Sequence, residues 1–344
     1  MPGSAVSVAI VGATGAVGRA LVQAIEESDL DIGELRLFAS ERSAGSEIDF
    51  RGELARVGPL RDGAFRDLDL AFFSATAEVA RAWAGRAWAA GCPVIDLSPA
   101  FRADADVPLV VAELNPGDVG GFRARGLVAT PGPGAVQLAL VLSPIHAAVG
   151  VERAVVTTCE AVSGAGQPAV DELESEMRAM LAFQEPPPPT VLPHRIAFNL
   201  IPQVGSMGED GVSDEERAIV AETRRLLGAD PPRIAALALR VPVFYGHAQA
   251  VNIRTSRPLS AADARALLAR APGVKVVDAP AQGVYPMPML AVNDDAVLVG
   301  RVRDDATQER GLDLFLTADN VRKGGASNAF AVARLLLERR RAQR

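Results

Sequence analysis

The sequence predicts an α/β protein in which a doubly wound parallel sheet is followed by an α+β domain with a mixed sheet. Three observations support this fold class. A glycine-rich turn joins the first apolar strand to a helix, strands and helices alternate through the first part of the chain, and alternating β-branched strands dominate the second part. The 344 residues are enough for two domains with cores of their own.

The glycine-rich turn marks the start of the first domain. Residues 6–11 form an apolar run typical of a buried parallel strand. Gly12, Gly15 and Gly18 follow at regular spacing and let the backbone turn sharply and pass close to a ligand. The helix that begins there presents unpaired amides and the positive end of its dipole, which suits a pyrophosphate. The turn therefore predicts a Rossmann-like nucleotide site, although a tight turn without a ligand has the same pattern.

The first domain continues with alternating strands and helices. Further strands are expected at 34–39, 69–74, 93–96, 109–112 and 127–129. Helices are expected after Gly18, at 78–90 and, beyond a rigid turn at 130–137, at 138–147. Doubly wound sheets bind ligands at the carboxyl ends of their strands, and Ser74 and Asp96 lie at such ends in this arrangement.

The loop at 40–45 follows the second expected strand, where an acid usually holds the ribose 2′-hydroxyl of NAD. Arg42, flanked by the hydroxyls of Ser40 and Ser43, suits the 2′-phosphate of NADP instead. Glu41 in their midst leaves NAD possible. A solvated loop with ordinary charges is the alternative interpretation.

The second domain is expected to begin near Thr130 and to mix strands with helices. The expected strands are 153–158, 234–244, 251–255, 296–302 and 312–316, and the expected helices are 168–183, 214–227, 261–270 and 328–339. Ser213 and Ser260 are typical N-cap residues for two of these helices. The proline-rich stretch 185–190 predicts an extended connector.

The composition excludes several classes of protein. A net charge of −7 does not attract nucleic acid, and no apolar run is long enough for a transmembrane helix. No signal peptide precedes the first strand, and the two cysteines, Cys92 and Cys159, do not make a disulfide framework. We therefore expect a cytoplasmic protein without a nucleic-acid or membrane partner, and no motif predicts a metal site.

Blocks of sequence in a fixed order along the chain carry a resemblance to a known family. They are GATGAVG at 12–18, the loop at 40–45, VIDLSPAFR at 94–102, DVPLVVAELN at 106–115, EAVSGAGQ at 160–167, AFNLIPQV at 197–204, RVPVFYGHAQAVN at 240–252 and DNVRKGGASNA at 319–329. With them the chain resembles the aspartate-β-semialdehyde dehydrogenase family over nearly its whole length. The resemblance implies a homodimer with an NAD(P)-binding domain at 1–130, completed by a final helix at 320–344, and a substrate-binding and dimerisation domain at 131–319.

The resemblance also implies a reaction from which this chain departs. In the family, a cysteine thiolate at a helix N-terminus attacks an aldehyde, NADP takes the hydride, and phosphate cleaves the thioester. The cysteine belongs to an Asn-Pro-Asn-Cys turn, which here reads Thr130-Pro131-Gly132-Pro133. Pro133 has no thiol or hydroxyl, so the covalent step cannot start from it. In this respect the chain is most similar to the Usg-type paralogue, which also lacks the cysteine.

Other positions of the family site are replaced as well. Glu160 stands where the family has the glutamine partner of the cysteine, and it adds a negative charge where a substrate carboxylate should lie. Leu97 replaces an asparagine near the nicotinamide, and Ala218 replaces a lysine.

The resemblance, read together with the sequence pattern, assigns a set of site residues. The predicted catalytic residues are His247 as general acid/base, Arg240 as the substrate-carboxylate contact, and Glu160; the predicted substrate or phosphate contacts are Arg102 and Arg240. The predicted cofactor contacts are Gly12, Thr14, Gly15, Ala16, Val17, Ser40, Arg42, Ser43, Ser74 and Asn320. Without the resemblance, Arg102 is also compatible with the surface and His247 with a structural role.

These observations lead to three functional hypotheses. The leading one is a family member that binds NADP, or NAD, and a small carboxylate or phosphate ligand but lacks the standard thiol-dependent activity. The alternative is an active NAD(P)-dependent carbonyl or alcohol oxidoreductase, because hydride transfer needs a proton donor such as His247 but no thiol. The third is residual family activity through Cys159. Adjacent strand residues point to opposite faces, so Cys159 is expected to point away from the pocket if Glu160 points into it.

Overall fold

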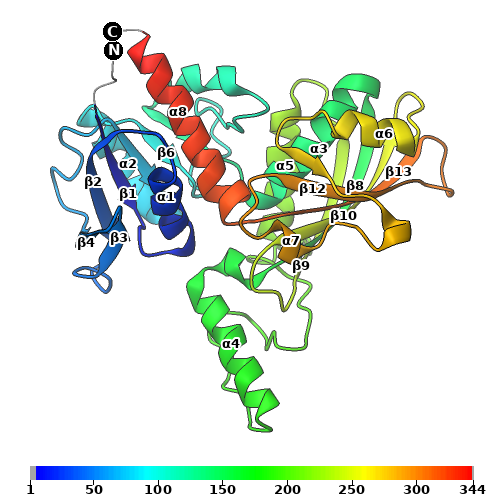
Figure 1. The fold of residues 1–344 in the computed structure, drawn as a ribbon, viewed down its shortest axis with the longest axis horizontal. Helices are drawn as coiled ribbons and strands as arrows, with labels where there is room; N and C mark the ends of the chain where they lie inside the picture. The colour runs from blue at the N-terminus through cyan, green and yellow to red at the C-terminus, as the bar shows by residue number, and fades with distance from the viewer. Residues whose placement is uncertain (1–4, 343–344) are drawn as a thin grey trace. The chain divides into compact units, whose positions relative to one another are not determined.

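The computed structural model describes residues 5–342, which form two compact units (Figure 1). One unit comprises residues up to Gly132 together with those from Gly325 onward, and the other runs from Pro133 to Gly324. These limits lie a few residues beyond the boundaries expected at 130 and 319. Each unit is built around a sheet of its own.

The first unit contains a seven-stranded sheet, which confirms the expected α/β architecture. In spatial order its strands are β3 (Glu47–Phe50), β4 (Glu53–Pro59), β2 (Ile32–Ala39), β1 (Val6–Val11), β5 (Leu70–Phe73), β6 (Val94–Asp96) and β7 (Leu127–Ala129). Neighbouring strands are parallel except β3 and β4. The carboxyl ends of β1, β2, β5 and β6 therefore lie along the same edge of the sheet, which is where such sheets bind ligands.

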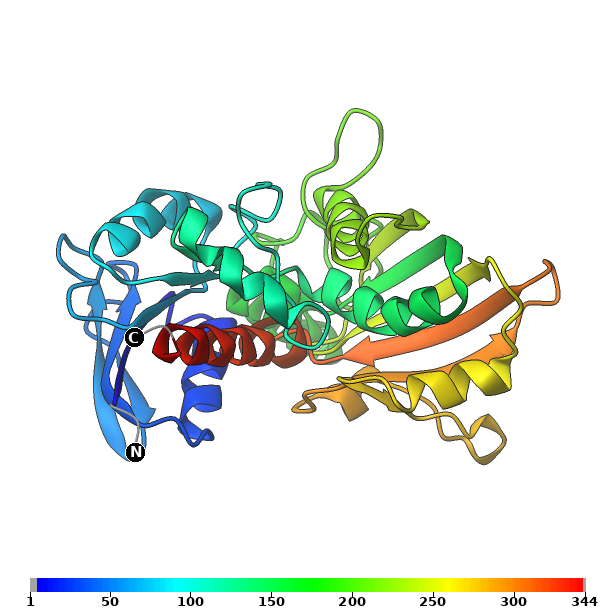
Figure 2. The same cartoon turned by 90° about the horizontal axis from the view of Figure 1, so that it is seen from above.

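Helices cover both faces of this sheet. α1 (Ala16–Glu26) and α8 (Ser327–Arg341) lie side by side on one face (Figures 1 and 2), although they come from opposite ends of the chain. Apolar residues of both helices share one buried cluster with the central strands. α2 (Ala77–Ala89) packs on the other face, where its Trp83 lies against the ring of Phe65.

The hairpin formed by β3 and β4 was not predicted from the sequence. Its turn contains Arg51 and Gly52, both with positive φ. Ile48 and Val57 are the buried residues of the two strands, and the rest are exposed or half-buried. Two buried side chains do not make the regular alternation by which a strand is recognised.

The prediction of a strand at 109–112 is wrong. Leu109 forms a single isolated bridge to β7, and the run does not continue as a strand. The side chains of Asn115 and Asn328 bond to its backbone, each accepting from one amide and donating to one carbonyl. Buried backbone groups need such partners, and here side chains supply them in place of a neighbouring strand. A 3₁₀ helix at Pro116–Ala124 leads on to β7.

The second unit is built on a mixed sheet, as expected, and this sheet has six strands where five were predicted. In spatial order its strands are β11 (Val274–Val276), β12 (Val297–Asp304), β13 (Gly311–Ala318), β10 (His247–Thr255), β8 (Val151–Glu160) and β9 (Arg233–Arg240). β11 is parallel to β12 and β8 to β9, whereas the other neighbouring pairs are antiparallel.

The helices of the second unit pack mainly on one face of this sheet. They are α3 (Pro133–Val149), α5 (Asp214–Leu227) and α6 (Ala261–Leu268), with α4 (Gln167–Leu181) and the short α7 (Pro288–Ala291) elsewhere in the unit. Within this unit α4 projects away from the sheet (Figure 1).

Local sequence signals set the ends of several elements. The hydroxyls of Ser213 and Ser260 cap α5 and α6, which confirms both predicted N-caps. α3 begins at Pro133, earlier than expected, because proline needs no amide partner at the first helical position and is favoured there. β9 ends at Arg240, whereas the expected strand continued to 244, because Pro242 cannot donate to a ladder.

Substitution of Gly18 tests how tightly the first turn is packed. A Cβ at this position would lie 2.1 Å from the carbonyl oxygen of Gly12, whereas one at Gly85 of α2 would meet no described atom within 4 Å. Gly18→Ala should therefore lower the free energy of unfolding by about 2 kcal/mol or more, and Gly85→Ala should raise it by about 0.5–1 kcal/mol. Urea unfolding is followed by the fluorescence of Trp83 and Trp88, the two tryptophans, both in α2. An unchanged Gly18→Ala would contradict the close packing.

Candidate functional site

The glycine-rich turn forms a cradle at the carboxyl end of β1. Gly12 has a φ of +87°, and a Cβ there would lie 2.6 Å from the carbonyl oxygen of Ser74. Gly15 is the N-cap of α1, and within the described residues no side chain caps this helix and no acid lies in its first turn. The amides of the first turn and the positive end of the helix dipole therefore face an approaching anion without competition from the chain. These features fit the pyrophosphate of a dinucleotide.

The remaining predicted contacts of the turn lie close to this cradle. Thr14, Ala16 and Val17 belong to the turn and to the first residues of α1. The Ser74 hydroxyl donates to the carbonyl oxygen of Val11 at 3.0 Å, which joins the end of β5 to the end of β1.

Ser40, Arg42 and Ser43 lie in the turn that follows β2. Ser40 and Arg42 are exposed, and Ser43 is half-buried. The Gly12 amide donates to the carbonyl oxygen of Phe38 at 2.8 Å, so the end of β2 lies next to the glycine cradle. The structure therefore brings these three residues to the same edge of the sheet as the cradle.

Arg102 lies after β6 at this edge. It is half-buried, and its Nη2 donates to the carbonyl oxygen of Leu97 at 2.7 Å. Asp96, the last residue of β6, is buried, and burial raises the pKa of its carboxyl to about 6 although Ser98 and Arg102 both favour ionisation. Arg102 is therefore held against the sheet and is not a fully exposed side chain.

In the second unit, strand register brings Arg240, Glu160 and His247 into one row. They are the last residue of β9, the last of β8 and the first of β10. Arg240 pairs directly with Glu160. Ala248 pairs with Cys159 on the other side of β8, so continuing the register places His247 opposite Glu160. Directly opposed residues point to the same face of a sheet, and all three side chains are buried.

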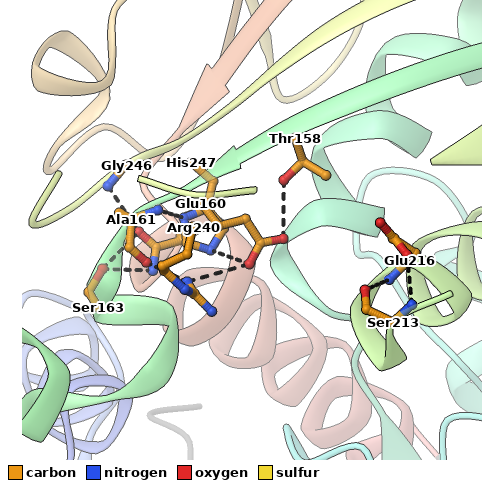
Figure 3. A network of polar contacts seen from close by, with 10 residues as sticks. Thr158, Glu160, Ala161, Ser163, Ser213, Glu216, Arg240, Gly246 and His247 are labelled. Atoms are coloured by element: carbon orange, nitrogen blue, oxygen red, sulfur yellow. Dashed lines mark hydrogen bonds and ion pairs between the residues drawn. The ribbon is translucent and has the colours of Figure 1, made fainter. Parts of the chain in front are cut away.

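The Glu160 carboxylate faces both basic side chains (Figure 3). Its Oε2 is 3.6 Å from Nη1 of Arg240 and 3.6 Å from Nε2 of His247. Its Oε1 accepts a hydrogen bond from the Thr158 hydroxyl at 3.1 Å. Nη1 of Arg240 also donates to the carbonyl oxygen of Ala161 at 2.7 Å. The ion pair is therefore held in place by hydrogen bonds on both sides.

Burial governs the charges of these groups. It raises the pKa of Glu160, although Arg240 and the Thr158 hydroxyl favour the ionised form. Burial also lowers the pKa of Arg240, although the charges of Glu160 and Glu215 raise it. A guanidinium nevertheless keeps its proton in proteins. Burial and the charge of Arg240 together hold the pKa of His247 well below its usual range. His247 is therefore neutral near pH 7.

The hydrogen bonding of His247 fixes its tautomer. Nδ1 accepts a hydrogen bond from the Ala161 amide at 3.1 Å, so the single ring proton is on Nε2, which faces Glu160. The Thr317 hydroxyl donates to the backbone carbonyl of His247 at 2.9 Å and holds the strand end. The imidazole thus presents one oriented N–H, which can donate to a carbonyl or alcohol oxygen.

A second network holds Asn320 beside the loop that follows β8. Its Nδ2 donates to the Ser163 hydroxyl at 3.0 Å, and its Oδ1 accepts from the Gly246 amide at 2.9 Å. Both ends of the side-chain amide are therefore used within the second unit. The role of Ser163 was not predicted from the sequence.

Gly164 closes over the row of buried charges. A Cβ at this position would lie 2.8 Å from Nη1 of Arg240 and 3.0 Å from Nε2 of His247. The loop can pass this close only without a side chain. The run of small residues at 163–166 was the available sequence signal for this contact.

Pro133 and the cysteines occupy different surroundings. Pro133 begins α3, where it stands against Gly324: a Cβ on that glycine would lie 2.4 Å from the Cβ of Pro133. Cys159 lies on the opposite face of β8 from Glu160, as the alternation predicts, and burial and that carboxylate raise the pKa of its thiol. Cys92 is fully buried, and its pKa is raised to about 12.

Residues 5–342 contain neither a membrane-spanning helix nor a cluster of metal-ligating side chains. None of the helices in that range combines the length and apolar character needed to cross a membrane. The same residues contain no group of three His, Cys, Asp or Glu side chains that could hold a metal ion.

The protonation of His247 can be measured directly. We expect the neutral tautomer with its proton on Nε2 throughout the pH range in which a free imidazole titrates, because burial and Arg240 oppose the imidazolium. Long-range proton–nitrogen NMR distinguishes the tautomers, and His247→Gln assigns the signal. His194 is exposed and gives a solvent-accessible comparison. A His247 signal that titrates with a midpoint near about 6.5 would contradict the buried neutral state.

Two family models match the chain. The semialdehyde dehydrogenase NAD binding domain matches residues 7–121, and the semialdehyde dehydrogenase dimerisation domain matches residues 142–323. The glycine cradle lies in the first match, and Glu160, Arg240 and His247 lie in the second.

Relatives match over the whole chain. The aspartate-semialdehyde dehydrogenase of Aquifex aeolicus is 42% identical over 96% of this chain and 98% of its own length. The crystal structure of aspartate semialdehyde dehydrogenase II from Vibrio cholerae, complexed with ASA, has a TM-score of 0.94 at 38% identity and covers 98% of this chain and 99% of its own. The Candida albicans enzyme with NADP shares the fold, with a TM-score of 0.74 at 23% identity over 97% and 99%. The chain thus belongs to the aspartate-semialdehyde dehydrogenase family.

Proposed function

We propose that this protein binds NAD(P) and forms a homodimer but does not carry out the thiol-dependent oxidation of an aldehyde. Pro133 carries the proposal, because it begins α3 at the position where the covalent step would need a thiolate. A pyrrolidine ring offers no group that can add to a carbonyl. In this respect the protein is proposed to be a Usg-type paralogue within its family.

Neither cysteine is suited to replace the missing thiol. The nucleophile in such a step is the thiolate, so a raised pKa works against it. Burial raises the pKa of both Cys92 and Cys159. Cys159 also lies on the face of β8 away from Glu160, which argues against residual activity through this residue.

NADP is the proposed cofactor, and NAD is the alternative. The glycine cradle and the start of α1 support a pyrophosphate site. Arg42, between the hydroxyls of Ser40 and Ser43, supports a 2′-phosphate, whereas Glu41 leaves room for NAD. When bound, either dinucleotide would supply or accept a hydride.

The open face of the second sheet supports a homodimer. Leu237, Thr157, Ala250 and Phe315 form one row across β9, β8, β10 and β13, on the face away from Glu160. Leu237 is 48% exposed, and Ala250 is exposed as well. A sheet face that leaves apolar side chains in water is typical of a surface that another subunit covers. We infer that a second copy of the chain covers it.

A second candidate function is oxidoreduction between a carbonyl and an alcohol. The observation that favours it is the oriented Nε2 proton of neutral His247, because a donor to the carbonyl oxygen is what hydride transfer requires from the protein. No thiol takes part in this chemistry. Arg240 and Glu160 would then act by holding the imidazole and the ligand in place.

The small-molecule ligand is proposed to carry a phosphate or a carboxylate, with Arg102 as a contact held at the carboxyl edge of the first sheet. Within the second unit Arg240 is proposed as a contact for such a group, and its pairing with Glu160 limits which ligands fit there. A cytoplasmic location is proposed because both cysteines are free thiols.

Arg42→Ala tests the preference for NADP. Loss of the guanidinium should weaken NADP binding about tenfold or more and change NAD binding by less than about twofold, because only NADP carries the 2′-phosphate. Fluorescence titration measures both affinities. Arg61→Ala, which removes an exposed arginine elsewhere in the first unit, should change neither. Equal losses for the two dinucleotides would contradict the assignment, and no binding of either would overturn both candidate functions.

An activity assay tests whether the absence of a thiol at position 133 prevents the reaction. Wild type should show no phosphate-dependent NADP reduction with aspartate semialdehyde. Pro133→Cys combined with Glu160→Gln should raise turnover about a hundredfold or more above that background, because it supplies a thiol and removes the buried carboxylate. Glu160→Gln alone restores no thiol and should stay at background. Wild-type turnover that Arg240→Ala or His247→Ala abolishes would overturn the proposal.

A further inference from the structure

The carboxylate of Glu160 faces two groups that commonly bind anions. Its Oε2 lies 3.6 Å from the Arg240 guanidinium and 3.6 Å from Nε2 of His247 (Figure 3). Its other oxygen accepts from Thr158, and only 3% of Glu160 is exposed. The two basic groups therefore already face a carboxylate, and it belongs to the chain itself.

The charges around Arg240 do not favour a further anion. Glu160 and Glu215 are the charged side chains that act on the guanidinium, and both are acidic. His247 is neutral, so it adds no positive charge. A ligand carboxylate at Arg240 would meet the Glu160 carboxylate in a buried region, where charges are poorly screened. Removing that ligand from water would be costly, and Glu160 already opposes the charge of Arg240 that would have to repay it.

An uncharged ligand avoids this penalty. A carbonyl or hydroxyl oxygen can accept from Nε2 of His247 without adding charge. Burying a neutral group that keeps a hydrogen bond costs far less than burying an ion without a partner. The charge balance of the row therefore favours a neutral ligand.

We propose that Glu160 is a specificity-determining residue, which acts as the chain's own carboxylate toward Arg240 and His247 so that the site rejects carboxylate anions and accepts an uncharged carbonyl or alcohol. The inference rests on the proposed function, which makes this row a ligand site. It replaces the anionic group proposed at Arg240 with an uncharged one and leaves the proposed phosphate contact of Arg102 unchanged. The competing explanation is an ion pair that only stabilises the second unit.

The test compares an anion with its uncharged counterpart. Succinate and succinamide share a skeleton and differ in charge, and each is titrated by calorimetry with NADP present at about pH 8, which favours ionised Glu160. Wild type should bind succinamide about tenfold or more tightly than succinate. Glu160→Gln should strengthen succinate binding about tenfold or more and change succinamide binding by less than about threefold.

Glu185→Gln is the matched control, because it makes the same change in net charge at an exposed residue of the proline-rich connector. It should leave both affinities as in wild type. The proposal is overturned if Glu160→Gln binds succinate no more tightly than wild type does, which includes the case in which neither binds it. If Glu160→Gln fails to fold, Glu160→Ala removes the same charge and takes its place.

The outcome can be separated from that of the proposed function. The NADP titration reports on cofactor binding and does not depend on the ligand charge at Glu160. If NADP does not bind, the proposed function fails whatever the succinate result. If NADP binds while wild type and Glu160→Gln treat the two probes alike, the proposed function stands and this inference alone fails.

Discussion

The register at the end of β8 is the constraint on which the site depends. It places Arg240, Glu160 and His247 in one buried row, and buried charges must then find partners within the chain. Glu160 faces both basic groups, and the Ala161 amide fixes the imidazole. A slip of one residue in any of the three strands would turn these side chains to the opposite face. The row is therefore a closed polar network before any ligand arrives.

In the proposed function, two positions of this chain act in the same direction. Pro133 removes the nucleophile at the start of α3. Glu160 places a negative charge beside Arg240, whereas the neutral amide of a glutamine there would not form an ion pair with the guanidinium. A site without a thiolate has no need to hold an anionic aldehyde beside it, so the charge balance at Arg240 can shift toward another ligand. The glycine cradle of the first unit is independent of both changes, because its glycines and helix start are set by local geometry. Retention of a cofactor domain and loss of the covalent step are therefore compatible.

Much of this architecture could be predicted from the sequence because its signals are local. The Ser213 cap and the alternation that turns Cys159 away from Glu160 follow from backbone geometry within a few residues. The strand expected at 109–112 failed because Asn328, far along the chain, supplies the hydrogen bonds that a strand would have made. The tautomer of His247 also depends on the Ala161 amide, which lies 86 positions away in the sequence. Such facts belong to tertiary structure, and a pattern in one segment does not contain them.

The proposed function requires that no thiolate of this chain attacks the aldehyde. Intact-mass spectrometry tests it most directly, after incubation with aspartate semialdehyde and NADP in the absence of phosphate, so that any acyl-enzyme would persist. We expect an unchanged mass, because Pro133 has no nucleophile and Cys159 lies on the other face of β8 with a raised pKa. A mass increase that peptide mapping assigns to Cys159 would contradict it.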